Sequence, residues 1–150
     1  MPRRELKNGK QVADWLAKVG GTLKASGDMT LIGSAALLWH AQERGLPAEW
    51  PESSMAVDPG TDSDEVARLC YEALIGSEFE RAHGWHINLM PESVLRELPS
   101  GWKERAAKKQ IGKLNLIVPA PADLLAPKLK RNEARDRAHA EWARHIGLLD

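Results

Sequence analysis

The stretch Met29-Thr-Leu-Ile-Gly-Ser-Ala-Ala-Leu-Leu-Trp-His40 decides the fold of this chain. Its first residues form a short apolar run, which predicts a strand over residues 29–32. The run stops at Gly33-Ser34 and continues as a helical pattern that ends at Gly45. A strand that turns directly into a helix leaves backbone N–H groups uncovered, and a phosphate can bind them. The stretch therefore predicts a phosphate- or nucleotide-binding turn, unless Ser34 simply caps the helix.

Length and composition limit the class of protein. With 150 residues, 43% of them hydrophobic and 28% charged, the chain suits one well-buried domain. No apolar run approaches the ~20 residues of a membrane-spanning helix, and no secretory signal is readable, so we expect a cytoplasmic protein without membrane association. The single cysteine, Cys70, excludes an internal disulfide. The formal net charge is zero, but acidic residues gather in the middle and basic residues in the C-terminal third. This asymmetry is consistent either with charged surfaces that contact only solvent or with a basic surface that binds an anionic ligand.

The order of the remaining segments predicts an α/β (α+β) domain, a small mixed β-sheet flanked by helices. We expect helices over residues 9–25, with a soft break at Gly20-Gly21, and over residues 34–44, 62–81, 91–98, 122–130 and 133–146. We expect the other strands over residues 53–58, 85–90 and 114–118, with a turn at Asp58-Pro59-Gly60 and a basic, poorly apolar stretch at residues 103–110. The whole chain then forms one domain, comprising an N-terminal helix (1–27), a sheet core (28–118) and C-terminal helices (119–150).

Two segments of the chain carry a resemblance to a known family. Leu31-Ile-Gly-Ser-Ala-Ala-Leu37 resembles the opening glycine motif of the nucleotidyltransferase-fold superfamily. Leu116-Ile-Val-Pro-Ala-Pro-Ala-Asp-Leu-Leu-Ala-Pro-Lys-Leu-Lys-Arg-Asn-Glu-Ala-Arg-Asp-Arg-Ala-His139 is similar to the closing segment of the AbiEii-like nucleotidyltransferases and of related uncharacterised nucleotidyltransferase-like proteins. The AbiEii-like group includes toxin halves of bacterial abortive-infection and toxin–antitoxin modules. The resemblance implies binding of a nucleoside triphosphate, Mg²⁺ as cofactor, transfer of a nucleotidyl group to RNA or protein, and an antitoxin or other operon partner.

The resemblance also implies roles for individual residues. Asp58 and Lys128 would be catalytic, and Asp58 and Asn88 would bind Mg²⁺. The residues that would bind the nucleotide follow the first strand or lie in the closing helices: Gly33, Ser34, Lys128, Arg131, Arg135 and Asp136. Three of these basic side chains share one face if a single helix runs through Asn132. Of the residues three or four positions from Asp136, only His139 offers a basic partner.

The chain departs from the family's metal-binding pattern on the second strand. The family places two carboxylates there with one residue between them, because alternate residues of a strand share a face. Here Ala56 takes the first place and Asp58 the second, while Asn88 replaces an acid on the next strand. Charged oxygens supply most of the affinity for Mg²⁺. Asp62-Ser-Asp64 also spaces two carboxylates by one residue, but a helix start explains it better.

Two functions remain open on these residues. One is an active nucleotidyltransferase. The other is a degenerate protein of the same fold that acts as a nucleotide-binding or protein-interaction module.

Overall fold

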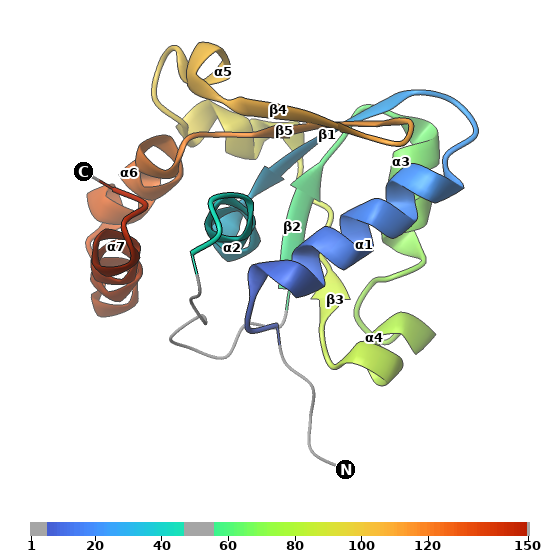
Figure 1. The fold of residues 1–150 in the computed structure, drawn as a ribbon, viewed down its shortest axis with the longest axis horizontal. Helices are drawn as coiled ribbons and strands as arrows, with labels where there is room; N and C mark the ends of the chain where they lie inside the picture. Colours follow the sequence, from blue (N-terminus) through green and yellow to red (C-terminus); the bar gives the residue numbers. More distant parts are fainter. Residues whose placement is uncertain (1–5, 47–55, 150) are drawn as a thin grey trace.

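The sheet has five strands: β1 (Gly27–Ile32), β2 (Ala56–Gly60), β3 (His86–Ile87), β4 (Ala107–Ile111) and β5 (Leu114–Val118). They lie in the order β3-β2-β1-β5-β4 (Figure 1). The central strand β1 pairs antiparallel with β2 and parallel with β5, β3 runs parallel to β2, and β4 runs antiparallel to β5. The computed structural model describes residues 6–46 and 56–149. The mixed sheet with flanking helices confirms the predicted fold class.

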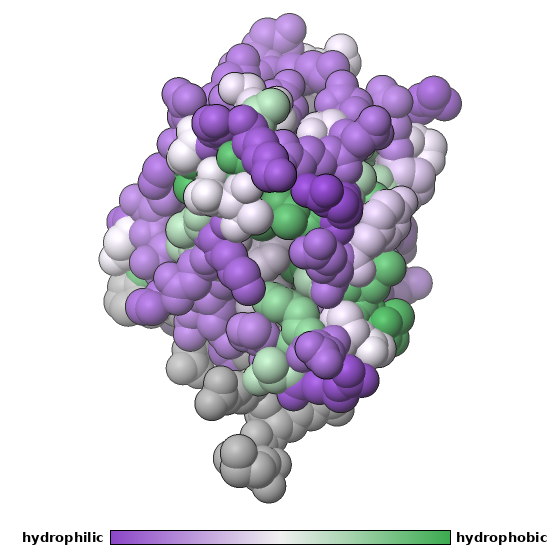
Figure 2. All heavy atoms as spheres, turned by 90° about the vertical axis from the view of Figure 1, so that its right-hand side faces the viewer, coloured by the Kyte–Doolittle hydropathy of each residue, from purple (hydrophilic) through white to green (hydrophobic). Residues whose placement is uncertain are grey.

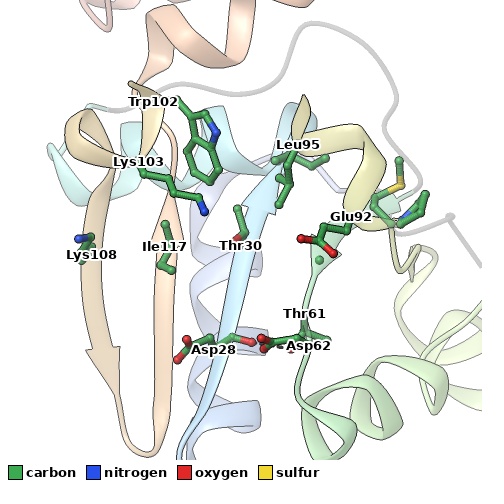
Figure 3. Close-up of a pocket in the computed structure, with 14 residues that line it drawn as sticks. Asp28, Thr30, Thr61, Asp62, Glu92, Leu95, Trp102, Lys103, Lys108 and Ile117 are labelled. Carbon is green, nitrogen blue, oxygen red and sulfur yellow. Dashed lines mark hydrogen bonds between the residues drawn. The ribbon is translucent and has the colours of Figure 1, made fainter. Parts of the chain in front are cut away.

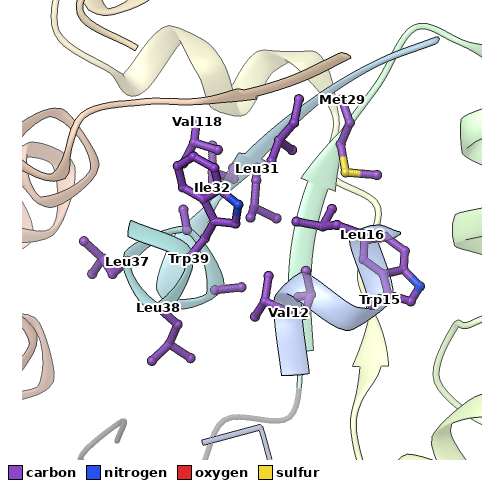
Figure 4. Close-up of a cluster of buried hydrophobic side chains, with 14 of the residues drawn as sticks. Val12, Trp15, Leu16, Met29, Leu31, Ile32, Leu37, Leu38, Trp39 and Val118 are labelled. Atoms are coloured by element: carbon purple, nitrogen blue, oxygen red, sulfur yellow. The ribbon is translucent and has the colours of Figure 1, made fainter. Parts of the chain in front are cut away.

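The hydrophobic core lies on one face of the sheet. Met29 and Leu31 of β1 are fully buried on that face, whereas Asp28 and Thr30 point to the other. Helix α1 (Gly9–Thr22) and helix α2 (Gly33–Glu43) bring Val12, Leu16 and Leu37 into the same cluster (Figure 4). The opposite face of the sheet is therefore left for polar residues and for shorter covering elements.

The helix predicted over residues 62–81 is two helices, α3 (Asp64–Tyr71) and α4 (Glu78–His83). Gly76 adopts a left-handed conformation between them, and the Ser77 side chain accepts a hydrogen bond from the Glu80 backbone to start α4. Helix α3 is capped by Ser63, whose side chain accepts a hydrogen bond from the Val66 backbone at 3.2 Å.

The predicted turn at Asp58-Pro59-Gly60 is wrong, because these residues belong to β2. Their partners on β1 are Ile32, Leu31 and Thr30. Pro59 has no N–H to donate, but its carbonyl accepts from the Met90 backbone at 2.8 Å, which keeps the next segment in place. The part of the predicted second strand at residues 53–55 and the predicted loop at residues 47–52 lie outside the described residues. The third predicted strand, over 85–90, is regular only at His86–Ile87.

The basic stretch at residues 103–110 holds an element that the sequence pattern did not show. It contains the end of the one-turn helix α5 (Trp102–Arg105) and most of β4, an edge strand on which Lys108, Lys109 and Gln110 are exposed. Lysines on an edge strand oppose pairing with other chains, and they also remove the apolar alternation that identifies a strand. A short 3-10 helix, η1 (Glu92–Glu97), forms within the predicted helix at 91–98.

Two helices close the chain, α6 (Pro121–Arg131) and α7 (Ala134–Ile146). Asn132 separates them in a left-handed conformation, φ 54°, so no continuous helix runs through it and the two helices pack as a hairpin. None of the helices in the described ranges is both long and apolar enough to cross a membrane. On the face formed by α1, α3 and α4, hydrophilic side chains cover most of the surface (Figure 2).

The glycine pair in α1 does not break that helix, and it offers a direct test of the packing. A Cβ at Gly20 would lie 2.0 Å from the Ile111 carbonyl oxygen, whereas a Cβ at Gly21 meets nothing within 4 Å. Gly20→Ala is therefore expected to lower the free energy of unfolding by about 2 kcal/mol through overpacking. Gly21→Ala is expected to raise it by roughly 0.5–1 kcal/mol, since alanine is the better helix former. Urea denaturation of both variants checks this, and equal effects would contradict the close approach of α1 to β4.

Candidate functional site

The predicted phosphate turn lies at the end of β1, where α2 begins. Gly33 has φ 75°, a conformation that glycine adopts without strain. The N-cap position belongs to Ile32, and no side chain caps the helix, so the alternative in which Ser34 caps α2 is wrong. Asp58 pairs with Ile32 across the sheet, and a Cβ at Gly33 would lie 2.6 Å from Asp58 Oδ2. The Gly33 turn and the predicted catalytic carboxylate of Asp58 are therefore close enough to be in contact.

Asn88 lies next to Asp58, as the sequence predicts. The Asn88 backbone donates to the Val57 carbonyl at 2.8 Å, and its side-chain Nδ2 donates to Asp58 Oδ1 at 3.3 Å. Burial raises the pKa of Asp58 to about 6, although the hydrogen bond from Asn88 and the positive charge of Lys128 act in the opposite direction. The carboxylate is thus in a partly desolvated position, within the electrostatic reach of Lys128.

Lys128 comes from α6 and lies close enough to Asp58 for its charge to act on that carboxylate. Its Nζ lies 3.1 Å from Nδ1 of His139, a buried residue of α7. Burial lowers the pKa of Lys128, while the negative charges of Asp136 and Asp58 oppose this shift. The position of α6 relative to α2 is fixed in part by His40, whose Nε2 donates to the Pro119 carbonyl at 2.7 Å. The closing helices therefore reach the opening turn.

The other predicted nucleotide-binding residues of the closing helices divide into two kinds. Asp136 is fully buried and accepts hydrogen bonds from Arg131 Nη2 at 3.0 Å and from the Glu133 backbone at 3.4 Å. The expectation that only His139 could pair with Asp136 is wrong, because the turn at Asn132 brings Arg131 back to it across the hairpin. Arg135 is exposed on α7. Arg131 and Asp136 hold the hairpin together, whereas Arg135 lies exposed on its surface.

The residues at this site do not form a magnesium site by themselves. Within the described ranges, no three His, Cys, Asp or Glu residues are grouped to hold a metal ion. Ala56 lies two positions before Asp58 on β2 and carries no ligand atom, and the Asn88 amide directs its NH₂ group at Asp58. One carboxylate is the smallest protein contribution to a Mg²⁺ site, because Mg²⁺ is usually held by one or two carboxylates together with the phosphates of a bound substrate. The Asp62-Ser-Asp64 stretch gives no replacement pair, because Ser63 and Asp64 start α3.

Two histidines that the sequence did not lead us to assign to the site belong to its surroundings. His139 contacts Lys128, and His86, two residues before Asn88, has Nδ1 2.7 Å from Glu80 Oε2. The alternation of residues 85–90 already placed His86 on the same side as Asn88, and this was the available signal. No sequence pattern indicated His139 as a neighbour of Lys128, because that contact needs the turn at Asn132.

Comparison with known proteins identifies a family for this chain. A family model described as "Nucleotidyltransferase of unknown function (DUF6036)" matches residues 10–150. No curated protein and no solved structure gives a significant match. The matched range includes the glycine turn, Asp58, Asn88 and both closing helices. The narrower resemblance to the AbiEii-like group stays a prediction.

Proposed function

The chain belongs to this family of nucleotidyltransferases of unknown function, and from that premise we propose that it binds a nucleoside triphosphate at the N-terminus of α2. The observation that carries the proposal is the convergence of Gly33, Asp58 and Lys128 from three separate parts of the chain. A half-buried lysine whose charge acts on Asp58, together with a helix N-terminus that no side chain caps, is a combination that suits a polyphosphate.

The charges at the site support this mode of binding. The N–H groups of the first turn of α2 would meet phosphate oxygens, with the helix dipole favouring their negative charge. Lys128 would supply a positive charge from α6, and Arg135 would extend the basic surface outward along α7. These groups would also offset the repulsion between the phosphates and Asp58. Arg131 would contribute mainly by holding Asp136 and thus the hairpin.

Binding without transfer is the function that the donor set favours. Of the three positions that the family pattern reserves for metal-binding acids, Asp58 alone carries a carboxylate, because Ala56 and Asn88 occupy the other two. The second candidate is transfer of a nucleotidyl group to an RNA or protein acceptor, with Mg²⁺, as in a toxin with an antitoxin or other operon partner. It is favoured by the place of Asp58, which lies where a reacting phosphate would be bound. The two candidate functions can be distinguished because only transfer yields a nucleotidylated RNA or protein.

Replacing Lys128 tests the nucleotide site directly. We expect Lys128→Ala to weaken binding of ATP, GTP, CTP or UTP by about tenfold or more, the usual effect of losing a charge-assisted hydrogen bond. Calorimetry with and without Mg²⁺ measures the affinity. Lys130→Ala is the matched control, since Lys130 is exposed on the same helix. Equal effects of the two substitutions, or no binding by the wild-type protein, would contradict the proposed site.

A labelling assay separates the two candidate functions. The purified protein is incubated with Mg²⁺ and α-labelled nucleotides, and label is sought on RNA and on protein. Binding without incorporation is the expected result. Label that appears in the wild-type protein's reaction and disappears with Asp58→Ala would instead establish transfer.

A further inference from the structure

Helix α7 buries two polar side chains on the face that packs against α6. Its buried residues, which include Asp136, His139 and Ala140, are spaced three or four apart and form one stripe of the helix. His139 is 3% exposed, at a place where a helix packed on another usually carries an apolar side chain. Burying a polar group costs free energy unless a hydrogen bond compensates for it. Both polar residues therefore need partners on the neighbouring helix.

The partners are two basic residues of α6, and the two contacts follow one another along the hairpin. Arg131 Nη2 donates to Asp136 Oδ1 at 3.0 Å. Three residues farther from the turn on each helix, Lys128 Nζ lies 3.1 Å from His139 Nδ1. The first contact pairs two charges, whereas the second pairs a lysine with an imidazole. The second contact is also the one that lies near the proposed nucleotide site, because the charge of Lys128 acts on Asp58.

The contact with Lys128 requires a neutral imidazole whose Nδ1 carries no proton. A lysine ammonium has three N–H donors and no acceptor, so its partner has to accept. A protonated His139 would place a second buried cation 3.1 Å from Nζ. Burial already lowers the pKa of Lys128, and the charges of Arg131 and Arg135 act in the same direction, against Asp136. The surroundings therefore disfavour a further positive charge.

A neutral acceptor restrains the lysine without cancelling its charge. One N–H donor of Lys128 is used by His139, and two remain for phosphate oxygens. Ordering a long, flexible side chain on binding lowers affinity, and a side chain that is already ordered avoids this cost. The half-buried Lys128 is thus held ready for an anion in the absence of a ligand.

Other lysines near the turn are placed differently. A cavity of about 290 Å³ on the open face of the sheet reaches Ile32, the last residue of β1, and is lined by Lys103 and Lys108 (Figure 3). Lys103 Nζ lies 5.8 Å from the centre of the Trp102 ring, and Lys108 is on β4, which β5 separates from β1. Of these three lysines, Lys128 is the one whose charge acts on the predicted catalytic carboxylate.

We propose that His139 is a positioning residue of the nucleotide site. Its neutral imidazole accepts a hydrogen bond from Lys128 and holds the ammonium ready for phosphates bound at the start of α2. His139 acts through Lys128 and does not touch the ligand. This inference rests on the proposed function, and it explains why α7 buries a histidine rather than an apolar residue at this point.

Calorimetry with ATP tests the role of His139. His139→Leu removes the acceptor and should weaken ATP binding roughly fivefold, because Lys128 then has to be ordered on binding. His139→Asn places an amide oxygen where Nδ1 was and should restore most of the affinity. His145→Leu is the matched control, since His145 is exposed on the same helix, and it should bind ATP as the wild type does. Thermal denaturation checks that each variant is folded.

A double variant separates positioning from a merely structural role. If His139 acts through Lys128, adding His139→Leu to Lys128→Ala should cause no further loss of ATP affinity. A general disturbance of the hairpin would instead add its effect to that of Lys128→Ala.

NMR of the ¹⁵N-histidine-labelled wild-type protein reports the contact without a ligand and without substituting His139. We expect His139 to carry its ring proton on Nε2, and we expect the Nδ1 resonance to shift in Lys128→Ala. Three results would each overturn this inference alone: a proton on Nδ1, wild-type ATP affinity in His139→Leu, or additive losses in the double variant. His139→Asn binding as weakly as His139→Leu would overturn it as well. A wild-type protein that binds no ATP would contradict the nucleotide site, and with it the role of His139.

Discussion

Arg131→Ala is expected to lower the free energy of unfolding by about 2 kcal/mol at neutral pH. The substitution leaves the carboxylate of Asp136, which is 0% exposed, without its guanidinium partner. Breaking a fully buried pair costs roughly 3–5 kcal/mol, and the lower figure applies here because the Arg131 side chain is 54% exposed and water screens the interaction. Urea denaturation measures the loss. Arg135→Ala, an exposed neighbour on the same hairpin, is the control and should change stability by no more than about 0.5 kcal/mol.

The pH dependence gives a second measure of the same pair. The hydrogen bond from Arg131 lowers the pKa of Asp136 in the folded protein. A carboxyl with a lowered pKa contributes stability above its unfolded pKa of about 3.9, and that contribution is lost as the pH falls through the folded pKa. The wild-type protein should therefore exceed Arg131→Ala in stability by more at pH 7 than at pH 3. A difference that is the same at both pH values would show that the guanidinium does not stabilise the ionised Asp136.

Gly33→Ala is expected to weaken nucleotide binding by more than about tenfold and to destabilise the fold by roughly 1–3 kcal/mol. The added Cβ would meet Asp58 Oδ2 at 2.6 Å in a backbone conformation, φ 75°, that already strains alanine. Either the carboxylate or the turn has to move, and both belong to the proposed phosphate site. Calorimetry with ATP and urea denaturation measure the two effects.

A matched glycine separates strain from the contact with Asp58. Gly45 also has a positive φ, 67°, but a Cβ there meets nothing within 4 Å. Gly45→Ala should therefore show the backbone penalty, about 1 kcal/mol, and bind ATP as the wild type does. If Gly33→Ala also retains full affinity for ATP, the turn at the start of α2 does not hold the nucleotide.

The sequence predicts best where local patterns and tertiary structure agree. The apolar run before Gly33 and the run at 114–118 are central strands, and burial on one face keeps their patterns clear. The family resemblance assigned Asp58, Asn88 and the Gly33 turn to one site, and the structure has them close together because their strands are neighbours in the sheet. The family resemblance also indicated Lys128 as a site residue. Its charge acts on Asp58 in the structure, which is consistent with a place in the same site.

The wrong predictions have physical causes that local sequence patterns do not show. Pro59 and Gly60 have the composition of a turn, yet they pair with β1. Residues 107–111 form a strand although their side chains are mostly exposed, because pairing with β5 supplies the backbone hydrogen bonds. The contact between Arg131 and Asp136 depends on one left-handed residue, Asn132, and helical spacing gives no sign of it.

The position of β1 between β2 and β5 has a consequence for how the chain folds during synthesis. Gly27 pairs with Leu114, which follows it by 87 positions, so one side of the central strand has no partner until β5 has left the ribosome. Contacts of such sequence separation slow folding, and an unpaired strand edge attracts other chains meanwhile. A chain truncated before Leu114 should therefore aggregate rather than fold. Newly made protein can complete its sheet only after β5 has been synthesised.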